Sequence, residues 1–411
     1  MKTPSLLNDP SLNRRLFLQR ASAGVAVIGA SPWLARAAAG ANERINIGCI
    51  GTGGRASALM GEILALAGAQ NVRIVAVCDV WQKNLQAAAA RVKQKLGEEP
   101  KQFTRFAELL AMKEVDAVTI ATPDFSHGAI LTAALKAGKD VYIEKPMTID
   151  LASANEAFDL ARAKQRVVQA GTQRRSDGKY LGAAKVLASG ALGTVSRFSV
   201  EMNFNESRWL RGTADCKAAD VDWDAFLLDL PKRDFDPKLL RQWQLYRATS
   251  NGLPGLWMTH FSDTAHLVTG AKYPTSAVAH GGIYVRKDGR EHTDTFVGLV
   301  DYPEGFLFSY AMGLGNAAGT HCTVHGTKAT LDLEKWTVMA ETKGAKPEPI
   351  AAEPNQSHMG NWLECLRSRQ RPNADIQFGH QHAVATIMTA RALETGRRQK
   401  YDPATRAITE G

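Results

Sequence analysis

Short apolar runs recur in the first part of the chain, and stretches compatible with amphipathic helices separate them. The runs cover residues 45–50, 72–78, 115–121 and 140–143. Strands that alternate with helices form a parallel sheet with helices on both of its faces. We therefore expect an α/β domain with a parallel sheet over residues 42–165.

Beyond about residue 194 the pattern changes to one strand after another. The expected strands are residues 195–200, 276–285, 295–301, 306–312, 321–324 and 330–333. Glycine-containing turns, including residues 287–289 and 303–305, separate several of them, which is typical of an antiparallel sheet. We expect an α+β domain over residues 166–376, built on a large, open, predominantly antiparallel sheet. An open face of such a sheet favours self-association, as a dimer or a tetramer.

Helical periodicity returns over residues 377–398, and this helix is expected to pack near the first domain, followed by a tail to residue 411. A chain of 411 residues with 45% hydrophobic content is longer than a domain built around one ordinary hydrophobic core. The two-domain division is therefore consistent with length and composition.

A glycine-rich turn follows the first predicted strand directly. Its residues are Gly51, Thr52, Gly53, Gly54, Arg55 and Ala56. The first glycine permits a tight turn, the second lets backbone N–H groups approach a pyrophosphate, and the alanine allows close helix packing. Asp79 ends the next strand and suits a ribose 2′-hydroxyl better than a 2′-phosphate. The sequence predicts a Rossmann domain that binds NAD(H) rather than NADP(H).

The first residues resemble an export signal. A paired arginine, Arg14-Arg15, precedes a mildly apolar stretch over residues 21–33 and a small-residue site at residues 35–37. This order is typical of a twin-arginine (Tat) signal peptide over residues 1–37. We expect the twin-arginine translocase to export the protein folded to the periplasm. Export in the folded state further predicts a cofactor that is loaded before export and held tightly.

Net charge and cysteine spacing exclude several other classes of protein. The chain carries +9, of which residues 1–37 contribute four charges, and no basic block or aromatic-basic repeat follows. We therefore expect no nucleic-acid partner and, after processing, no membrane span. The five cysteines show no CxxC spacing, and buried free thiols are expected, although a disulfide stays open. They are Cys49, Cys78, Cys216, Cys322 and Cys365.

Two later segments resemble the Gfo/Idh/MocA oxidoreductases: residues 121–127 (ATPDFSH) and the tripeptide Glu144-Lys145-Pro146. The resemblance extends through residues 170–175, 325–327 and 361–369. It implies a sugar or polyol, bound at the nicotinamide between the two domains. It also implies further contacts to the cofactor or the substrate, from Thr122, Pro123, His127, Glu144, Lys145, Gln173, Arg174 and Arg175.

Lys145 and His260 are the predicted catalytic residues. A lysine ammonium at the end of a core strand can polarise a substrate hydroxyl as hydride leaves its carbon. By resemblance, His260 accepts the hydroxyl proton, which a neutral imidazole can do near neutral pH. Family dehydrogenases place an aspartate four residues before this histidine, but this chain has Leu256 there. Asp263, one turn after His260, is an alternative acid.

Three functions follow from these residues. The first is an NAD-dependent sugar oxidoreductase. The second is a redox-neutral glycosidase or lyase that oxidises its substrate transiently, since residues 255–260 resemble a segment of NAD-dependent glycosidases, with Trp257 as a platform for a pyranose ring. The third is a sugar-binding protein without turnover, for which Leu256 is the only indication. Although His260, Asp263 and His266 share a helical face, we predict no metal site.

Overall fold

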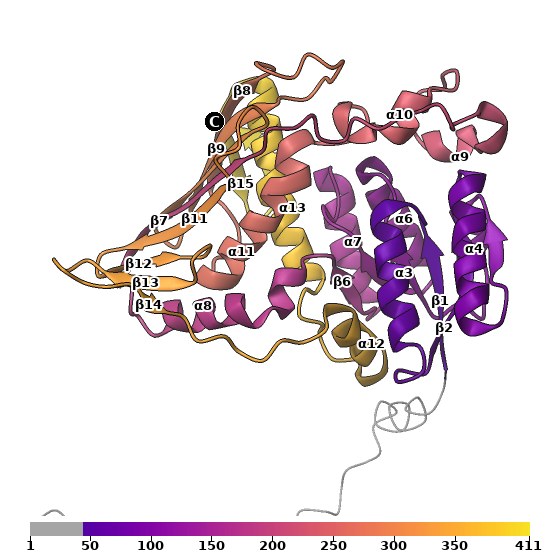
Figure 1. Ribbon diagram of the computed structural model, residues 1–411, viewed down its shortest axis with the longest axis horizontal. Coiled ribbons are helices and arrows are strands. Elements are labelled where there is room, and N and C mark those ends of the chain that lie inside the picture. Colours follow the sequence, from indigo (N-terminus) through magenta and orange to yellow (C-terminus); the bar gives the residue numbers. More distant parts are fainter. Residues whose placement is uncertain (1–43) are drawn as a thin grey trace, which may run out of the picture. The chain divides into compact units, whose positions relative to one another are not determined.

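The computed structural model describes residues 44–411 (Figure 1). The predicted signal peptide and its cleavage site lie outside the described residues. Within residues 44–411, no helix is both long and apolar enough to cross a membrane.

A six-stranded parallel sheet forms the first half, in the order β3-β2-β1-β4-β5-β6. Its strands are β1 (Ile45–Ile50), β2 (Val72–Cys78), β3 (Lys101–Phe103), β4 (Ala117–Ile120), β5 (Asp140–Ile143) and β6 (Val168–Ala170). The connecting helices are α3 (Gly54–Leu66), α4 (Gln82–Leu96), α5 (Phe106–Leu110), α6 (Asp124–Lys136) and α7 (Leu151–Ala163). The prediction of a Rossmann sheet is confirmed.

Apolar clusters cover both faces of this sheet because its central strands are buried on both sides. One cluster joins the sheet to α6 and α7, and the other joins it to α3 and α4. The second cluster also contains Met359 and Trp362 from α12 (His358–Ser368). A segment far along the chain therefore completes the core of the Rossmann half.

The second half contains a ten-stranded sheet, in the order β14-β13-β12-β11-β7-β10-β9-β8-β15-β16. Neighbouring strands are antiparallel except β7 and β10, which pair in parallel. The strands are β7 (Val195–Asn203), β8 (Ser276–Gly282), β9 (Thr295–Tyr302), β10 (Phe306–Gly313), β11 (Thr320–Gly326), β12 (Ala329–Asp332), β13 (Thr337–Ala340), β14 (Glu348–Pro349), β15 (Gln399–Asp402) and β16 (Ala407–Glu410). The prediction of a large, mostly antiparallel sheet is confirmed. The expected tail is in fact a hairpin, β15–β16, that extends the sheet.

Helices α11 (Thr259–Thr269) and α13 (Ile376–Thr395) lie on the side of this sheet that faces the Rossmann half (Figure 1). Inward side chains such as Phe296, Phe308 and Tyr310 are buried beneath them. Helix α13 also contacts α7 of the Rossmann half, as predicted for this helix. It therefore joins the two halves. Two short elements near this junction are η1 (Gln173–Ser176) and α8 (Gly178–Ala188).

Between β7 and β8 the chain leaves the sheet for residues 204–275. This excursion contains η2 (Ala218–Asp220), α9 (Trp223–Leu227), α10 (Pro237–Arg241), η3 (Trp243–Leu245), the π-helical turn η4 (Pro254–Met258) and α11. In Figure 1, α9 and α10 lie over the end of α4 in the Rossmann half. The excursion thus brings one wall of a cleft to the carboxyl edge of the parallel sheet.

Candidate active site

A cleft of about 610 Å³ lies at the carboxyl edge of the Rossmann sheet. The glycine loop, the residues that follow β2, β4 and β5, and the excursion all line it. Ligands of open α/β sheets bind at this edge, since the loops there diverge and leave a crevice. The cleft therefore lies where the spacing of the motifs predicts it.

The glycine loop has the backbone of a phosphate cradle. Gly51 adopts φ +80°, and a Cβ on it would lie 2.6 Å from the carbonyl oxygen of Ala121. Gly53 caps α3 without a side-chain hydrogen bond, and the first turn of that helix holds no acidic residue. The N–H groups at this helix end are thus available to an anion, which fits the pyrophosphate of NAD.

Asp79 lies beside this loop, directly after β2. Its Oδ2 accepts hydrogen bonds from the Thr52 backbone N–H at 2.8 Å and from the Thr52 hydroxyl at 2.9 Å. Its Oδ1 accepts from the Trp81 N–H at 3.0 Å, and the residue lines the cleft. Asp79 therefore holds the glycine loop in place as well as presenting a carboxylate where the ribose is expected.

Thr122, Pro123 and His127, which the resemblance assigns to the cofactor site, line the cleft beyond β4. The two ring nitrogens of His127 lie 2.7 Å from the Pro146 carbonyl oxygen and 2.9 Å from that of Thr122. The imidazole therefore links the loop after β4 to the loop after β5. Its contribution to the site is to fix these two loops against each other.

Glu144 connects the glycine loop to the catalytic segment. Its Oε1 accepts from Arg55 Nε at 2.7 Å and from Gln173 Nε2 at 3.3 Å. Its Oε2 accepts from the Lys145 backbone N–H at 3.1 Å. A Cβ on Gly171 would lie 2.8 Å from this carboxylate, so a larger residue there would displace the Glu144 side chain. Gln173 also donates to the Tyr142 hydroxyl, so it supports Glu144 from behind the cleft lining.

Lys145 lines the cleft, and its Nζ donates a 2.7 Å hydrogen bond to the backbone carbonyl of Leu256. Burial lowers the pKa of this amine, while Asp124 and Glu144 oppose that effect. Leu256 thus contributes to the site through its main chain, within the π-helical turn η4. Such turns are frequent at functional sites.

His260 lines the same cleft from the first turn of α11. Burial, together with the positive charges of Lys145 and Arg174, holds the pKa of its imidazole well below the usual value. The ring is therefore neutral at physiological pH. A neutral imidazole beside a lysine ammonium is equipped to accept a proton from a bound hydroxyl.

Asp124 is a residue of this site to which the sequence reasoning assigned no role. It is the first residue of α6, only 2% exposed, and lines the cleft with Lys145 and His260. The Ser250 hydroxyl donates to its Oδ2 at 3.3 Å. Asp124 belongs to the ATPDFSH segment, which follows β4. An acidic side chain in that segment was the feature of the sequence that could have identified it as a site residue.

The predictions for Arg175 and Asp263 need correction. Arg175 Nε contacts the two carboxylate oxygens of Asp263 at 2.8 and 3.0 Å, and both residues are buried outside the cleft lining. Burial by itself would raise the pKa of the Asp263 carboxyl, but the Arg175 guanidinium beside it helps to hold that pKa well below its usual range. Asp263 is therefore a structural partner of Arg175 in this geometry, not an acid for His260 or a substrate contact.

Arg174 and His266 do not line the cleft either. The Arg174 guanidinium stacks on Phe261 at 4.2 Å and donates to the Thr264 hydroxyl. His266 contacts the Tyr302 hydroxyl at 2.7 Å through Nε2. His260, Asp263 and His266 thus do not converge, and among the described residues no three His, Cys, Asp or Glu side chains gather around one point. All five cysteines are free and buried, as predicted.

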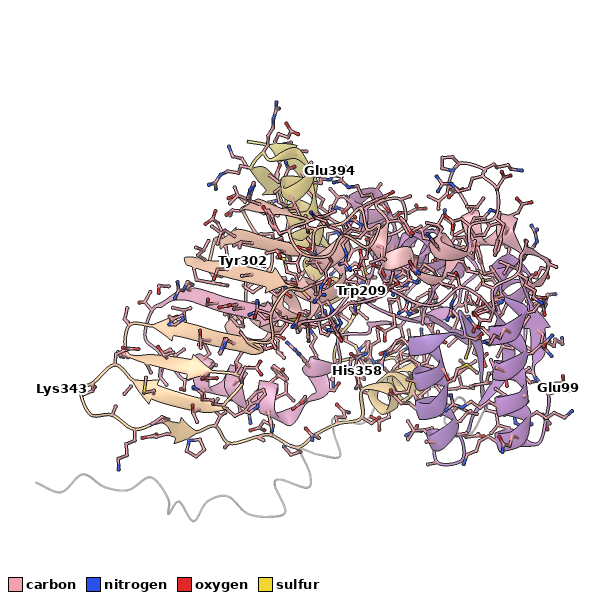
Figure 2. The ribbon with its side chains drawn as sticks, turned by 45° about the horizontal axis from the view of Figure 1, so that its top comes forward. Glu99, Trp209, Tyr302, Lys343, His358 and Glu394 are labelled. Atoms are coloured by element: carbon pink, nitrogen blue, oxygen red, sulfur yellow. The ribbon has the colours of Figure 1, made fainter. Side chains whose placement is uncertain are left out.

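Three tryptophan rings line the cleft on the side of the excursion. Trp257, from η4, lines it and lies 5.5 Å from Phe204 and 5.9 Å from His260 between ring centroids. Trp209 and Trp243 line it from the excursion, and Figure 2 shows Trp209 near the middle of the molecule, between the large sheet and the Rossmann half. Indole rings in such a position suit the apolar face of a sugar ring.

Two models of one protein family match the chain. The model described as "Oxidoreductase family, NAD-binding Rossmann fold" matches residues 45–172, and the "Oxidoreductase family, C-terminal alpha/beta domain" matches residues 228–408. The chain belongs to the Gfo/Idh/MocA oxidoreductase family. It is an NAD-dependent oxidoreductase, so the NAD prediction is confirmed. The geometry of Gly51, Gly53 and Asp79 described above fits that cofactor.

Among curated relatives of this oxidoreductase, inositol 2-dehydrogenase 1 of Saccharopolyspora erythraea is 34% identical over 154 residues, 36% of this chain and 43% of that protein. The uncharacterized oxidoreductase YdgJ of Escherichia coli is 24% identical over 289 residues, 70% of this chain and 71% of that protein. The chain thus spans less than half the length of the first relative and about 70% of the second.

Solved structures share the fold of this oxidoreductase at low identity. The WlbA dehydrogenase from Bordetella pertussis, in complex with NADH and UDP-GlcNAcA, has a TM-score of 0.66 and 20% identity, covering 88% of this chain and 99% of that one. The aldose-aldose oxidoreductase from Caulobacter crescentus has a TM-score of 0.66 and 19% identity, covering 87% and 100%. Such identities establish the shared fold alone.

Proposed function

We propose that this oxidoreductase transfers hydride between a hydroxyl-bearing carbon of a sugar or glycoside and NAD. This proposal depends on the observation that Lys145 and the neutral His260 line the same cleft as the glycine loop. Bound NAD would supply the hydride acceptor. The Lys145 ammonium would donate a hydrogen bond to the reacting oxygen, and His260 Nε2 or Nδ1 would take the hydroxyl proton.

The substrate class is inferred from the aromatic lining and from relatives. Trp257 and Trp209 would contact the apolar face of a sugar ring. A solved structure of a levoglucosan dehydrogenase, in complex with NADH and levoglucosan, shares the fold with a TM-score of 0.64, 15% identity, and 90% and 99% coverage. Together with the inositol dehydrogenase above, this similarity supports a polyhydroxylated ring as substrate.

The test is a panel of free sugars, uronates, inositols and glycosides, incubated with the purified protein and NAD. Turnover would appear as absorbance of the reduced nicotinamide together with a keto product identified by mass spectrometry. Lys145→Ala protein serves as the control for each sugar that reacts. If no sugar or polyol yields either signal with the wild type, the proposal fails.

We further propose that the bound NAD is retained between turnovers. Residues 209–246 of the excursion, here called the clasp, line the nucleotide cleft and attach to the Rossmann half. The Asp222 N–H donates to the Val80 carbonyl at 2.8 Å, and the Thr104 hydroxyl donates to the Asp222 carboxylate. The Phe226 ring lies edge-on to Phe125 at 5.6 Å. A dinucleotide beneath these contacts would leave only after they open.

Retention is tested by the matched substitutions Phe226→Ala and Phe235→Ala. Phe226 contacts the Rossmann half through Phe125, whereas Phe235 contacts Trp223 inside the clasp. We expect NAD to copurify with the wild type, and Phe226→Ala to raise its dissociation rate about tenfold or more, which corresponds to ~1.4 kcal/mol. An equal rate in the two variants, or a wild type that releases NAD within seconds, would contradict retention.

A redox-neutral glycosidase or lyase is the second candidate, favoured by two features. The side chain at position 256 is apolar, and a retained cofactor suits a reaction that returns the hydride to its own product. Incubation with aryl glycosides separates the two functions. Release of the aglycone without net formation of NADH would favour the second candidate, whereas a stoichiometric keto-sugar would favour the first.

We also propose twin-arginine export to the periplasm and self-association through the open face of the large sheet. Val297, 47% exposed, and its cross-strand neighbours Ala311 and His280 lie on that face. Fractionation of cells that produce the wild type and an Arg14→Lys/Arg15→Lys variant tests the first proposal. Sedimentation of the wild type and Val297→Asp protein tests the second, and a monomeric wild type would contradict it.

A further inference from the structure

Asp124 occupies the region of the site that Leu256 leaves without an acidic side chain. Asp124 begins α6 and Gly255 belongs to η4, yet a Cβ on Gly255 would lie only 4.0 Å from Asp124 Oδ2. The carboxylate is therefore adjacent to the turn that contains Leu256. On the other side of that turn, the Leu256 carbonyl accepts from Lys145 Nζ. The turn η4 thus lies next to Asp124 and also accepts a hydrogen bond from Lys145, and both residues line the same cleft.

We propose that Asp124 is a positioning residue that replaces the missing acid and favours the charged form of Lys145, while the Leu256 carbonyl holds the ammonium in place. This inference rests on the proposed function, because it assigns Lys145 the role of hydrogen-bond donor to substrate. No bond to Asp124 forms or breaks during the reaction. The hydroxyl proton goes to His260, and the hydride goes to NAD.

The charges around Lys145 show why Asp124 is the decisive carboxylate. Glu144 also faces the lysine, but it is engaged by Arg55 at 2.7 Å. His260 is neutral, and Arg55 adds a further positive charge near the amine. Asp124 has no arginine partner within the part of the chain that the structure describes. Its negative charge is therefore the main compensation for burying a lysine here.

The titration of Asp124 itself agrees with this geometry. Burial raises the pKa of its carboxyl to about 7, while Lys145 and the Ser250 hydroxyl act in the opposite direction. Glu144 adds a smaller unfavourable interaction. With a pKa of about 7 the Asp124 carboxyl loses its proton near neutral pH, so it supports the charge of Lys145 at and above that pH. Removing the carboxylate should leave the lysine amine neutral at a lower pH than in the wild type.

The first test is the pH profile of kcat/KM for Asp124→Asn. We expect a turnover at least about tenfold below that of the wild type, and an alkaline limb displaced to lower pH by roughly one unit or more. A merely structural role would reduce activity or thermal stability without moving the limb. An unchanged limb would overturn the proposal.

Relocating the charge provides the matched control. In the Asp124→Asn background, Leu256→Asp places a carboxylate at the position used by family dehydrogenases, and Leu256→Asn places an amide of the same shape there. We expect the variant with Leu256→Asp to recover part of the lost turnover and to shift the alkaline limb back to higher pH. The variant with Leu256→Asn should show neither change. Equal behaviour of the two double variants would overturn the proposal.

A chemical readout separates this inference from the proposed function. Acetic anhydride acetylates only neutral amines, and peptide mass spectrometry of the full-length protein gives the extent at Lys145 over a range of pH. We expect the midpoint to be lower in Asp124→Asn than in the wild type. Equal labelling in both, including none in either, would overturn the proposal. If the midpoint shifts but no sugar is oxidised by the wild type, the proposed function fails, and only the effect of Asp124 on the charge of Lys145 stands.

Discussion

The nucleotide end and the substrate end of the cleft are built on different principles. At the nucleotide end, backbone N–H groups of a glycine loop form the site, and Asp79 fixes them through Thr52 and Trp81. At the substrate end, side chains from the Rossmann edge and from the excursion meet, and a main-chain carbonyl of Leu256 replaces a side chain. The residues of the nucleotide end lie close together in the sequence, whereas those of the substrate end come together only when the chain folds.

This difference indicates that substitutions can alter the substrate chemistry without altering cofactor binding. The glycine loop requires particular backbone angles, so its residues are constrained by geometry alone. The substrate end requires a charge balance around Lys145, which more than one position can supply. Asp124 and Leu256 illustrate such a redistribution, and the following predictions test how separate the two ends are.

Lys145→Ala should have the largest effect. We expect kcat/KM to fall about 10²- to 10⁴-fold, because the donor to the reacting oxygen is lost. NAD affinity, measured by quenching of tryptophan fluorescence, should change less than about threefold. Lys136→Ala, which removes an exposed lysine paired with Glu156, is the control. A parallel loss of NAD affinity in Lys145→Ala would show that the two ends are coupled.

Arg175→Leu should mainly affect stability. It leaves the buried Asp263 carboxylate without its arginine, with only His382 Nδ1 at 3.6 Å, and breaking such a buried pair typically costs about 3–5 kcal/mol in the free energy of unfolding. Urea titration would measure this change, and the Arg175→Leu/Asp263→Leu variant should recover much of it. A large rise in KM with unchanged stability would instead support the original prediction that Arg175 contacts substrate.

Gly51→Ala should affect the nucleotide end alone. A side chain at φ +80°, with its Cβ 2.6 Å from the Ala121 carbonyl, should lower the free energy of unfolding by about 1–2 kcal/mol and weaken NAD binding. Gly54→Ala is the control for stability, since a Cβ there meets no protein atom within 4 Å. Equal melting temperatures for the two variants would contradict the strain argument.

The smallest expected effect is on the acidic side of the pH profile. A base with a lowered pKa stays deprotonated as the pH falls, so activity that depends on neutral His260 should persist below pH 6.5. We expect the acidic limb of kcat/KM to lie below that value by a measurable margin. An acidic limb at or above pH 6.5 would argue that another group controls it.

The fold and the nucleotide end could be predicted because their signals lie within short segments. Periodicity identified the longer strands of both sheets but not the short strands β3, β6, β13 and β14. The glycine loop and Asp79 follow their strands directly. The hairpin β15–β16 was missed because it contains few apolar residues, so its pairing depends on the edge of β8.

The substrate end could be predicted only in part. Lys145 and His260 stand in motifs, and both line the cleft. The Arg175–Asp263 pair joins residues 88 positions apart, so only tertiary packing reveals that these charges neutralise each other. Any residue at position 256 would supply the same main-chain carbonyl, so a sequence pattern cannot distinguish it from any other main-chain oxygen.

The parallel pairing of β7 with β10 has a consequence for how such enzymes diversify. The chain leaves the sheet after β7, returns at β8, and is then led back by two hairpins to lie beside its point of departure. Both attachment points of residues 204–275 are thereby anchored in one rigid framework. Changes in the loops of this segment that spare Leu256 and His260 can therefore remodel one wall of the cleft while the sheet framework and the glycine loop stay in place.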